Sequence, residues 1–191
     1  VPSPKILLKA FEEVKPNLIL TVPLILEKIY KKMILPQLSK TTMKVALNIP
    51  LLDSRIYAQI RKKLVDAFGG RFREVIVGGA AMNEEVTNFL YKIKFPFTIG
   101  YGMTECGPLI SYDHNDEYVP GSCGQILKGI MKVRIDSEDP YNKVGEIQVS
   151  GENVMKGYYK NEEATSKVFT EDGWLRTGDL GTIDADNRIY I

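Results

Sequence analysis

The chain has 191 residues, of which 44% are hydrophobic and 26% are charged, and its formal net charge is +1. These fractions are typical of globular chains, so they exclude a disordered, collagen-like or coiled-coil protein. The length is sufficient for one ordinary domain or two small ones. The balanced charge argues against a nucleic-acid partner.

Charge is nevertheless unevenly distributed along the chain, since residues 1–116 carry 16 Lys or Arg against 11 Asp or Glu, whereas residues 117–191 carry 9 against 13. This asymmetry indicates either two units or a solvated basic face.

Cysteine and histidine are scarce. Cys106 and Cys123 are the two cysteines and His114 is the single histidine. Two cysteines cannot form a disulfide framework or a four-thiolate zinc site, which favours reduced thiols in a cytoplasmic protein. We interpret His114 as a surface-loop residue. No apolar run reaches the roughly 18 residues of a membrane span. Residues 1–4 resemble no signal peptide, and we expect both ends of the chain to be internal to a longer protein.

The first half of the chain alternates between helical and strand patterns. Ser3 followed by Pro4 predicts the start of a helix, which Pro16 should end. A short apolar run predicts a buried strand over residues 18–22. A second helix should begin at Pro23, with an apolar side formed by Leu26, Ile29, Tyr30 and Met33.

The same alternation continues to about residue 100. The segment 36–52 has no firm pattern, and Asp53 is expected to cap a third helix. A strand over residues 73–77, a helix capped by Asn83 and a strand over residues 95–99 follow. Alternating helices and strands predict α/β layers around a largely parallel sheet, whose ligands bind at the carboxyl ends of the strands.

After about residue 117 the pattern changes to short strands separated by glycines. Alternating residues predict strands over residues 132–135, 146–149 and 181–184, and only residues 161–168 read as a helix. We expect a small barrel-like or curled β unit here. The predicted organisation is therefore an α/β portion over residues 1–116 and a β-barrel-like subdomain over residues 117–191.

Three loops carry residues suited to nucleotide chemistry. Gly78 to Ala81 follow a strand and leave bare backbone against which a flat ligand could lie, although a tight turn would need the same residues. Tyr101 to Glu105 combine an aromatic ring, a glycine, a hydroxyl and a carboxylate suited to Mg²⁺, although a polar loop with a buried tyrosine fits equally. Asp179 could accept hydrogen bonds from a ribose diol, or it could form a turn with Arg176 as a local partner.

Considered together, the motifs indicate a family. The segments GGAAM at 78–82, YGMTE at 101–105, GEIQVSGENVMKGYY at 145–159 and WLRTGDL at 174–180 occur in this order. The set resembles the adenylate-forming superfamily of acyl-CoA synthetases, nonribosomal peptide adenylation domains and luciferases. Within it, the chain most resembles the long-chain fatty acid–CoA ligases, over essentially its whole length.

The resemblance implies an activity and roles for particular residues. Such enzymes join a fatty acid to ATP, with Mg²⁺, as an acyl-adenylate, and then transfer the acyl group to coenzyme A. Thr104 and Glu105 would be catalytic, Thr104 touching the α-phosphate and Glu105 holding Mg²⁺. Nucleotide would be bound by Gly78, Gly79, Ala80, Tyr101, Gly102, Met103, Thr104 and Asp179, with Tyr101 stacking on the base and Asp179 on the ribose hydroxyls.

The chain also departs from the pattern of such enzymes. The phosphate-binding loop of such enzymes would lie before Val1, and the small domain that brings the catalytic lysine would follow Ile191. We therefore expect a fragment that is inactive alone. Two alternatives stay open, a non-catalytic nucleotide- or acyl-binding module and a ligase for an aryl or amino acid. Oligomeric state is open, and the resemblance allows peripheral membrane association of the parent protein.

Overall fold

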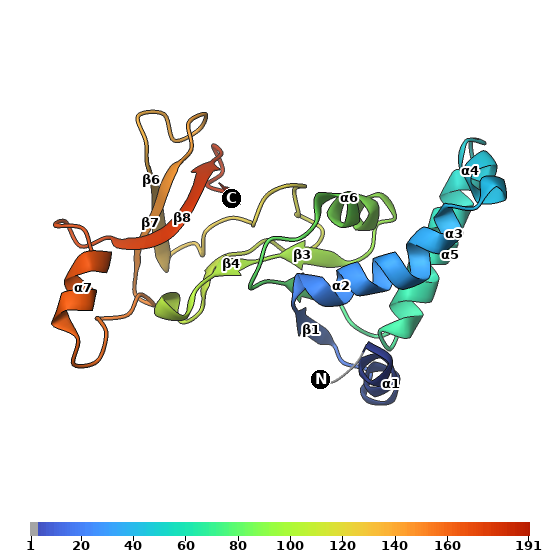
Figure 1. Cartoon of the computed structure of the whole chain (residues 1–191), viewed down its shortest axis with the longest axis horizontal. Helices are drawn as coiled ribbons and strands as arrows, with labels where there is room; N and C mark the ends of the chain where they lie inside the picture. The colour runs from blue at the N-terminus through green and yellow to red at the C-terminus, as the bar shows by residue number, and fades with distance from the viewer. Residues whose placement is uncertain (1–3) are drawn as a thin grey trace. The chain divides into compact units, whose positions relative to one another are not determined.

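The computed structural model describes residues 4–191, so the predicted cap Ser3 lies outside the described residues (Figure 1). The chain forms two compact units, Val1–Phe97 and Thr98–Ile191. This division precedes the predicted change at residues 116 and 117. The reason is that residues just after Phe97 pack with the later strands: Tyr101, Cys106 and Ile110 belong to the same hydrophobic core as the antiparallel sheet of the second unit.

The first unit is an α/β arrangement. Its elements are α1 (Pro4–Val14), β1 (Leu18–Thr21), α2 (Pro23–Ile29), the π-helix η1 (Tyr30–Ile34), α3 (Leu35–Leu38), α4 (Thr41–Leu47), α5 (Leu52–Ala67), β2 (Glu74–Val77), α6 (Glu84–Lys92) and β3 (Phe97–Ile99). Strand β2 lies between β1 and β3, and β1 pairs with it in parallel from Leu18 opposite Glu74 to Thr21 opposite Val77. The predicted strands and the α/β layers are confirmed.

Helix boundaries follow local chemistry in most places. Asn83 caps α6 as predicted, because its side chain accepts a hydrogen bond from the backbone N–H of Val86 at 3.3 Å. The prediction that Asp53 caps the third helix is wrong. Helix α5 begins at Leu52, its cap position is Leu51, and the carboxylate of Asp53 instead accepts from the backbone N–H of Ser54 at 2.6 Å.

The second helix departs from its predicted apolar side. Leu26, Ile29 and Tyr30 are buried as expected, but Met33 is exposed and Ile34 is buried instead. The π-helix η1 explains this difference. Its wider turn shifts the residues that follow relative to the α-helical pattern, so the next buried position falls one residue later.

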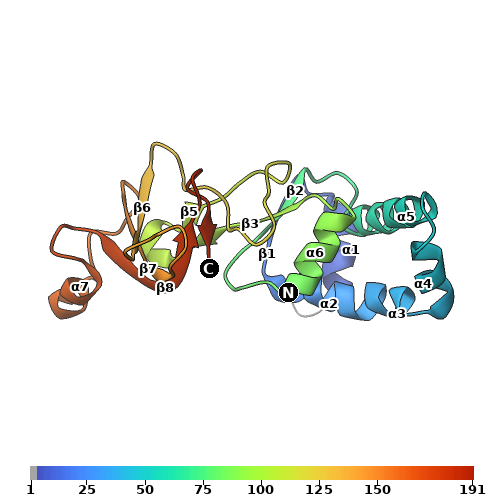
Figure 2. The ribbon, with the colours of Figure 1, turned by 90° about the horizontal axis from the view of Figure 1, so that it is seen from above.

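Helices α2 to α5 form an arm within the first unit. Helix α2, η1 and α3 lead outward from the sheet, α4 turns the chain, and α5 returns toward β2, as Figures 1 and 2 both show. At the base of the arm, aromatic rings from α1, from the residue that follows α5 and from the segments beside the sheet pack together. The ring centroid of Phe68 lies 5.4 Å from that of Phe11, 6.0 Å from that of Phe72 and 5.7 Å from that of Phe95.

The second unit contains the predicted antiparallel strands. Its elements are β4 (Tyr101–Gly102), the 3₁₀ helix η2 (Thr104–Cys106), β5 (Leu109–Ser111), β6 (Met131–Asp136), β7 (Gly145–Gly151), α7 (Glu162–Val168), β8 (Leu175–Ile183) and β9 (Ile189–Tyr190). Strands β6, β7, β8 and β9 form one curled sheet in which every neighbouring pair is antiparallel. The predicted curled β unit is confirmed. Within the described residues, no helix has the length and apolar character needed to cross a membrane.

Candidate nucleotide site

Tyr101 and Asp179 lie together in the second unit although 78 residues separate them in sequence. The hydroxyl of Tyr101 donates to the carboxylate of Asp179 at an O–O distance of 2.7 Å. Tyr101 is only 9% exposed and its ring packs in the core of this unit, whereas Asp179 is exposed. Burial raises the pKa of the Tyr101 phenol, and the Asp179 carboxylate raises it further, so the phenol stays protonated and remains a donor.

A bulge in strand β8 presents Asp179. Gln148 pairs with Arg176 and Glu146 pairs with Leu180, so three residues of β8 lie opposite the single residue Ile147 of β7. The hydroxyl of Thr177 donates to the carbonyl of Ile147 at 2.8 Å and accepts from the backbone N–H of Asp179 at 3.1 Å. Gly178 has a φ of +78°, a conformation that glycine adopts without strain. Such bulges redirect side chains, and this one points Asp179 toward Tyr101.

The structure does not contain the alternative arrangement, in which Asp179 forms a turn with Arg176 as its local partner. Arg176 pairs with Glu146, with 3.5 Å between guanidinium nitrogen and carboxylate oxygen. The described contact of the Asp179 carboxylate is with Tyr101. The loop predicted from the sequence is therefore part of a strand, and the tertiary contact holds its acidic side chain.

Gly102 is required by the fold itself. It pairs with Leu109 in the short β4–β5 hairpin, and a Cβ atom at this position would overlap the carbonyl oxygen of Pro108. The close approach expected at Gly102 is thus made first by the chain's own backbone. Met103 follows in extended conformation and packs partly against the core, and Thr104 is exposed at the start of η2.

Glu105 is half-buried and its side chain contacts a residue that the sequence did not single out. The hydroxyl of Tyr158 donates to Oε1 of Glu105 at 2.9 Å. The carboxylate of Glu105 raises the pKa of the Tyr158 phenol, mainly through this hydrogen bond. Among the described ion pairs, none joins Glu105 to an Arg or Lys side chain.

A second set of contacts joins the same two segments through the backbone. The backbone N–H of Met155 donates to the carbonyl of Glu105 at 2.7 Å. The side-chain amide of Asn153 donates to the carbonyls of Cys106 at 2.6 Å and Leu109 at 3.0 Å. The segment from Asn153 to Tyr158 therefore holds the 3₁₀ turn that carries Thr104 and Glu105. Sequence reasoning quoted these residues within a motif but assigned them no role.

We expect Asn153→Ala to lower the free energy of unfolding by about 2 kcal/mol, because it leaves the carbonyls of Leu109 and of the buried Cys106 without their donor. Urea unfolding of the 191-residue chain measures this. Asn88→Ala is the matched control, since Asn88 is exposed and makes only a 3.5 Å contact with Glu84. Equal effects of the two substitutions would contradict the assignment.

Gly78, Gly79 and Ala80 belong to the other unit, where they follow β2 directly. Gly79 has a φ of +86°, and both Gly79 and Ala80 are exposed. A turn therefore follows β2 and its backbone is accessible. This agrees both with a tight turn and with a backbone surface against which a flat ligand could lie.

Comparison with known proteins identifies a family over a stretch that includes the first three of the four motifs. Residues 1–159 match the model of the AMP-binding enzyme family. The chain belongs to this family.

Relatives in the family differ in their substrates. A 4-coumarate-CoA ligase of Narcissus pseudonarcissus is 36% identical over 74% of this chain, and a long-chain-fatty-acid–CoA ligase of Saccharomyces cerevisiae is 29% identical over 94% of it. The chain spans 28% of the length of each of these two relatives. The ATP-bound crystal structure of MatB from Rhodopseudomonas palustris superposes with a TM-score of 0.69 at 26% identity, covering 99% of this chain and 32% of that one.

The resemblance implies a magnesium ion, for which Glu105 would be the carboxylate ligand. The described residues include no group of three or more His, Cys, Asp or Glu side chains that could hold a metal. One carboxylate suffices for Mg²⁺ when substrate phosphates and water supply the other ligands. Glu105 is such a carboxylate, with one oxygen on Tyr158.

Other reactive side chains lie outside this arrangement. His114 is exposed and its ring contacts the hydroxyl of Tyr112 at 2.9 Å, in agreement with a surface loop. Burial raises the pKa of the Cys106 thiol to about 11, so the thiol is protonated at neutral pH and unsuited to act as a nucleophile.

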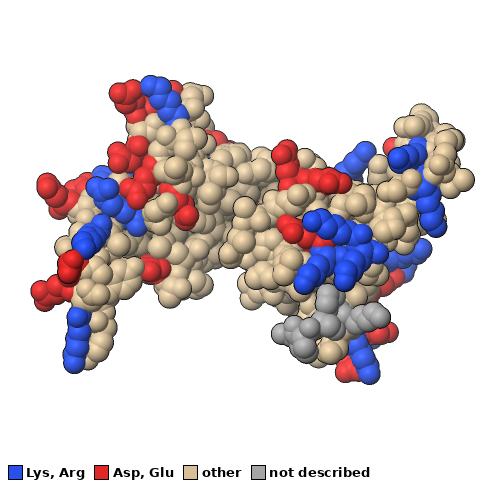
Figure 3. Space-filling model, viewed as in Figure 1, with Lys and Arg blue, Asp and Glu red and all other residues tan. Residues whose placement is uncertain are grey.

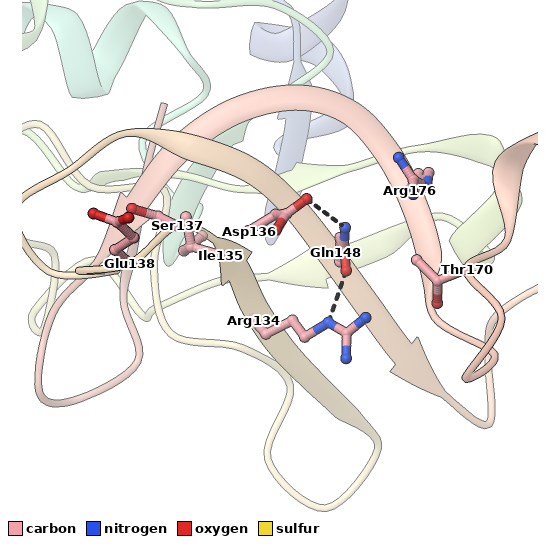
Figure 4. Close-up of a pocket in the computed structure, with 8 residues that line it drawn as sticks. All are labelled: Arg134, Ile135, Asp136, Ser137, Glu138, Gln148, Thr170 and Arg176. Atoms are coloured by element: carbon pink, nitrogen blue, oxygen red, sulfur yellow. Dashed lines mark hydrogen bonds between the residues drawn. The ribbon is translucent and has the colours of Figure 1, made fainter.

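A polar cavity of about 680 Å³ lies on the curled sheet (Figure 4). Its lining includes Arg134, which donates to Gln148 at 2.7 Å and forms a bidentate pair with Asp172 at 2.6 and 3.0 Å. Its guanidinium also lies 4.6 Å from the ring centroid of Trp174. This pairing holds the pKa of Asp172 well below its usual range. The described lining contains none of the expected nucleotide-binding residues, and its Arg134 is held by Gln148 and Asp172.

Proposed function

We propose that this chain forms part of the nucleotide site of an ATP-dependent acid–CoA ligase. The observation that carries the proposal is the hydrogen bond between Tyr101 and Asp179, two residues of separate motifs that the fold of the second unit brings together. Asp179 is exposed, so its second oxygen is accessible to a ribose diol. Thr104 and Glu105 stand on the adjoining turn.

The chemistry needs these groups for electrostatic reasons. The acid's carboxylate attacks the α-phosphorus of ATP, a carboxylate–phosphorus bond forms, the bond to the bridging oxygen breaks, and pyrophosphate leaves. Two anions must therefore approach one another. Thr104 would donate its hydroxyl to the α-phosphate, and Glu105 would hold Mg²⁺, which neutralises charge as it develops. Coenzyme A would then displace AMP through its thiol.

For the acid we propose a long-chain fatty acid, because the yeast long-chain-fatty-acid ligase matches 94% of this chain. An aryl acid is the second candidate, since the Narcissus 4-coumarate ligase has the higher identity, 36%, over a shorter match. Coenzyme A thioester formation by the whole ligase, assayed with palmitate and with 4-coumarate, decides between them. A rate with 4-coumarate that exceeds the rate with palmitate would overturn the first proposal.

The 191-residue chain by itself is expected to catalyse no exchange between ATP and pyrophosphate with any fatty acid. The chain spans 28% of the length of the two relatives. We expect the triphosphate-binding loop and the lysine-bearing domain of such ligases in the remainder, and groups of this kind supply orders of magnitude in rate. Radioactive pyrophosphate exchange measures the activity, with a whole ligase as the positive control. Exchange by the pure chain above the background without enzyme would contradict this expectation.

A further inference from the structure

The helical arm of the first unit is strongly basic. Residues 28–63 contain nine Lys or Arg and a single acidic residue, Asp53, so the segment has a net charge of +8 in a chain whose net charge is +1. Seven of the nine basic residues are exposed, and the described partner of one of them, Lys62, is Asp66 at 2.7 Å. Figure 3 shows the largest group of Lys and Arg over the α2 part of the arm, and a few basic side chains on the mostly uncharged surface near α4.

The outer end of the arm is apolar and uncovered. The turn that joins α4 to α5 contains Ile49, Pro50, Leu51 and Leu52 in succession, and all four are exposed. Ile49 is 48% exposed, Leu51 79% and Leu52 38%, and Val45 of α4 adds a side chain that is 59% exposed. A run of four exposed apolar residues at a turn is uncommon on a protein that contacts only water, and it marks a surface that binds another apolar phase.

The backbone of this turn is also unusual. Leu51 has a φ of +71°, in the left-handed region that favours glycine and that a bulky side chain enters at a cost. In this conformation Leu51, at 79%, is the most exposed large apolar residue among the described residues of the first unit. Glycine would adopt this positive φ with less strain, so the presence of leucine indicates a role for its side chain.

From the apolar turn and the basic residues around it, we infer that the α4–α5 end of the arm docks on an anionic lipid surface. Ile49, Leu51 and Leu52 enter the acyl boundary, where their exposed area leaves water. Lys40 at the start of α4, Lys44 on α4 and Arg55 on α5 are exposed and would face lipid phosphates. The one acidic residue of segment 28–63, Asp53, is half-buried and accepts from the backbone N–H of Ser54, and these three basic side chains outnumber it. Lipid explains both features, whereas a nucleic acid would use the charge alone.

Vesicle flotation of the 191-residue chain tests the inference independently of any ligase activity. Vesicles of phosphatidylcholine with phosphatidylglycerol are compared with phosphatidylcholine alone, at low and high salt. The chain should float with the anionic vesicles, and less so in high salt. Leu51→Gly with Leu52→Ser should lower the partition coefficient about tenfold or more, because two leucines no longer enter the bilayer. Lys40→Glu with Lys44→Glu should lower binding to the anionic vesicles and weaken its salt dependence.

Matched controls come from the second unit. Tyr141→Ser with Val144→Ser removes two comparably exposed apolar side chains, and Lys128→Glu with Lys132→Glu reverses two exposed charges. Both should float like the wild type. Folding is checked by thermal melting, and Leu51→Gly alone should melt no lower than the wild type because glycine accepts a positive φ. A wild-type chain that fails to float, or an unchanged partition in the leucine variant, would overturn the inference. Vesicle binding that a competing oligonucleotide abolishes but the leucine substitutions leave unchanged would also overturn the inference.

Discussion

Glu105→Gln is expected to slow acyl-adenylate formation in the whole ligase by about a hundredfold or more, with partial recovery at raised Mg²⁺. Glutamine keeps the size of the side chain and one oxygen that can accept from Tyr158, but it loses the charge that would hold the metal. The pH profile should change little, because a fatty acid is already ionised at neutral pH and no general base is needed. The measurement is the adenylation rate against Mg²⁺ concentration.

Tyr158→Phe is the matched control for Glu105. It removes the 2.9 Å hydrogen bond but leaves the carboxylate in place, so the dependence on Mg²⁺ should be kept and the rate should fall far less. If Glu105 serves only to hold the turn through this hydrogen bond, Tyr158→Phe should lower the melting temperature and slow adenylation at least as much as Glu105→Gln, which keeps an acceptor, and added Mg²⁺ should restore neither variant. The contact itself can be tested in the 191-residue chain, where Glu105→Gln should lower the pKa of Tyr158 toward its ordinary value in an ultraviolet titration.

Asp179→Ala is expected to abolish the affinity of the 191-residue chain for AMP, which we expect to be weak even in the wild type. The substitution removes two charge-assisted hydrogen bonds to the ribose diol, each worth about 1.5–3 kcal/mol at most. Isothermal calorimetry with AMP measures the loss. Asp116→Ala is a suitable control, because Asp116 is an exposed carboxylate of the same unit.

Tyr101→Phe distinguishes the binding of ribose by the Asp179 carboxylate from the positioning of that carboxylate by Tyr101. It removes the hydroxyl that donates at 2.7 Å but keeps the ring in the core. The fold should hold, and AMP affinity should fall by less than in Asp179→Ala, because the carboxylate can still accept from ribose. Equal AMP affinity in the wild type and in Asp179→Ala would refute the ribose role.

Local patterns in the sequence were enough to predict most helices and strands. Apolar residues at helical or alternating spacing mark which face of each element is buried, and Asn83 and Asn161 mark helix starts because their side chains accept from backbone N–H groups three residues on. Helix α4 was missed, and so was the π-helix η1, since neither leaves a clear period in a short segment.

The order of the motifs was likewise readable from the sequence, and it indicated the family, the chemistry and the candidate residues Tyr101, Glu105 and Asp179. Those signals lie within runs of a few residues, where each side chain's chemistry and its spacing from its neighbours can be read directly. Contacts between distant motifs leave no such pattern.

Only the tertiary structure decided how those residues are held. Tyr101 reaches Asp179 across 78 positions, and Glu105 reaches Tyr158 across 53. The first contact depends on the bulge at Gly178 and the second on the segment from Asn153 onward, which also binds the turn's carbonyls. Such contacts arise from sheet register and packing, which depend on the whole unit at once, so residues distant in sequence meet only when the core between them has formed.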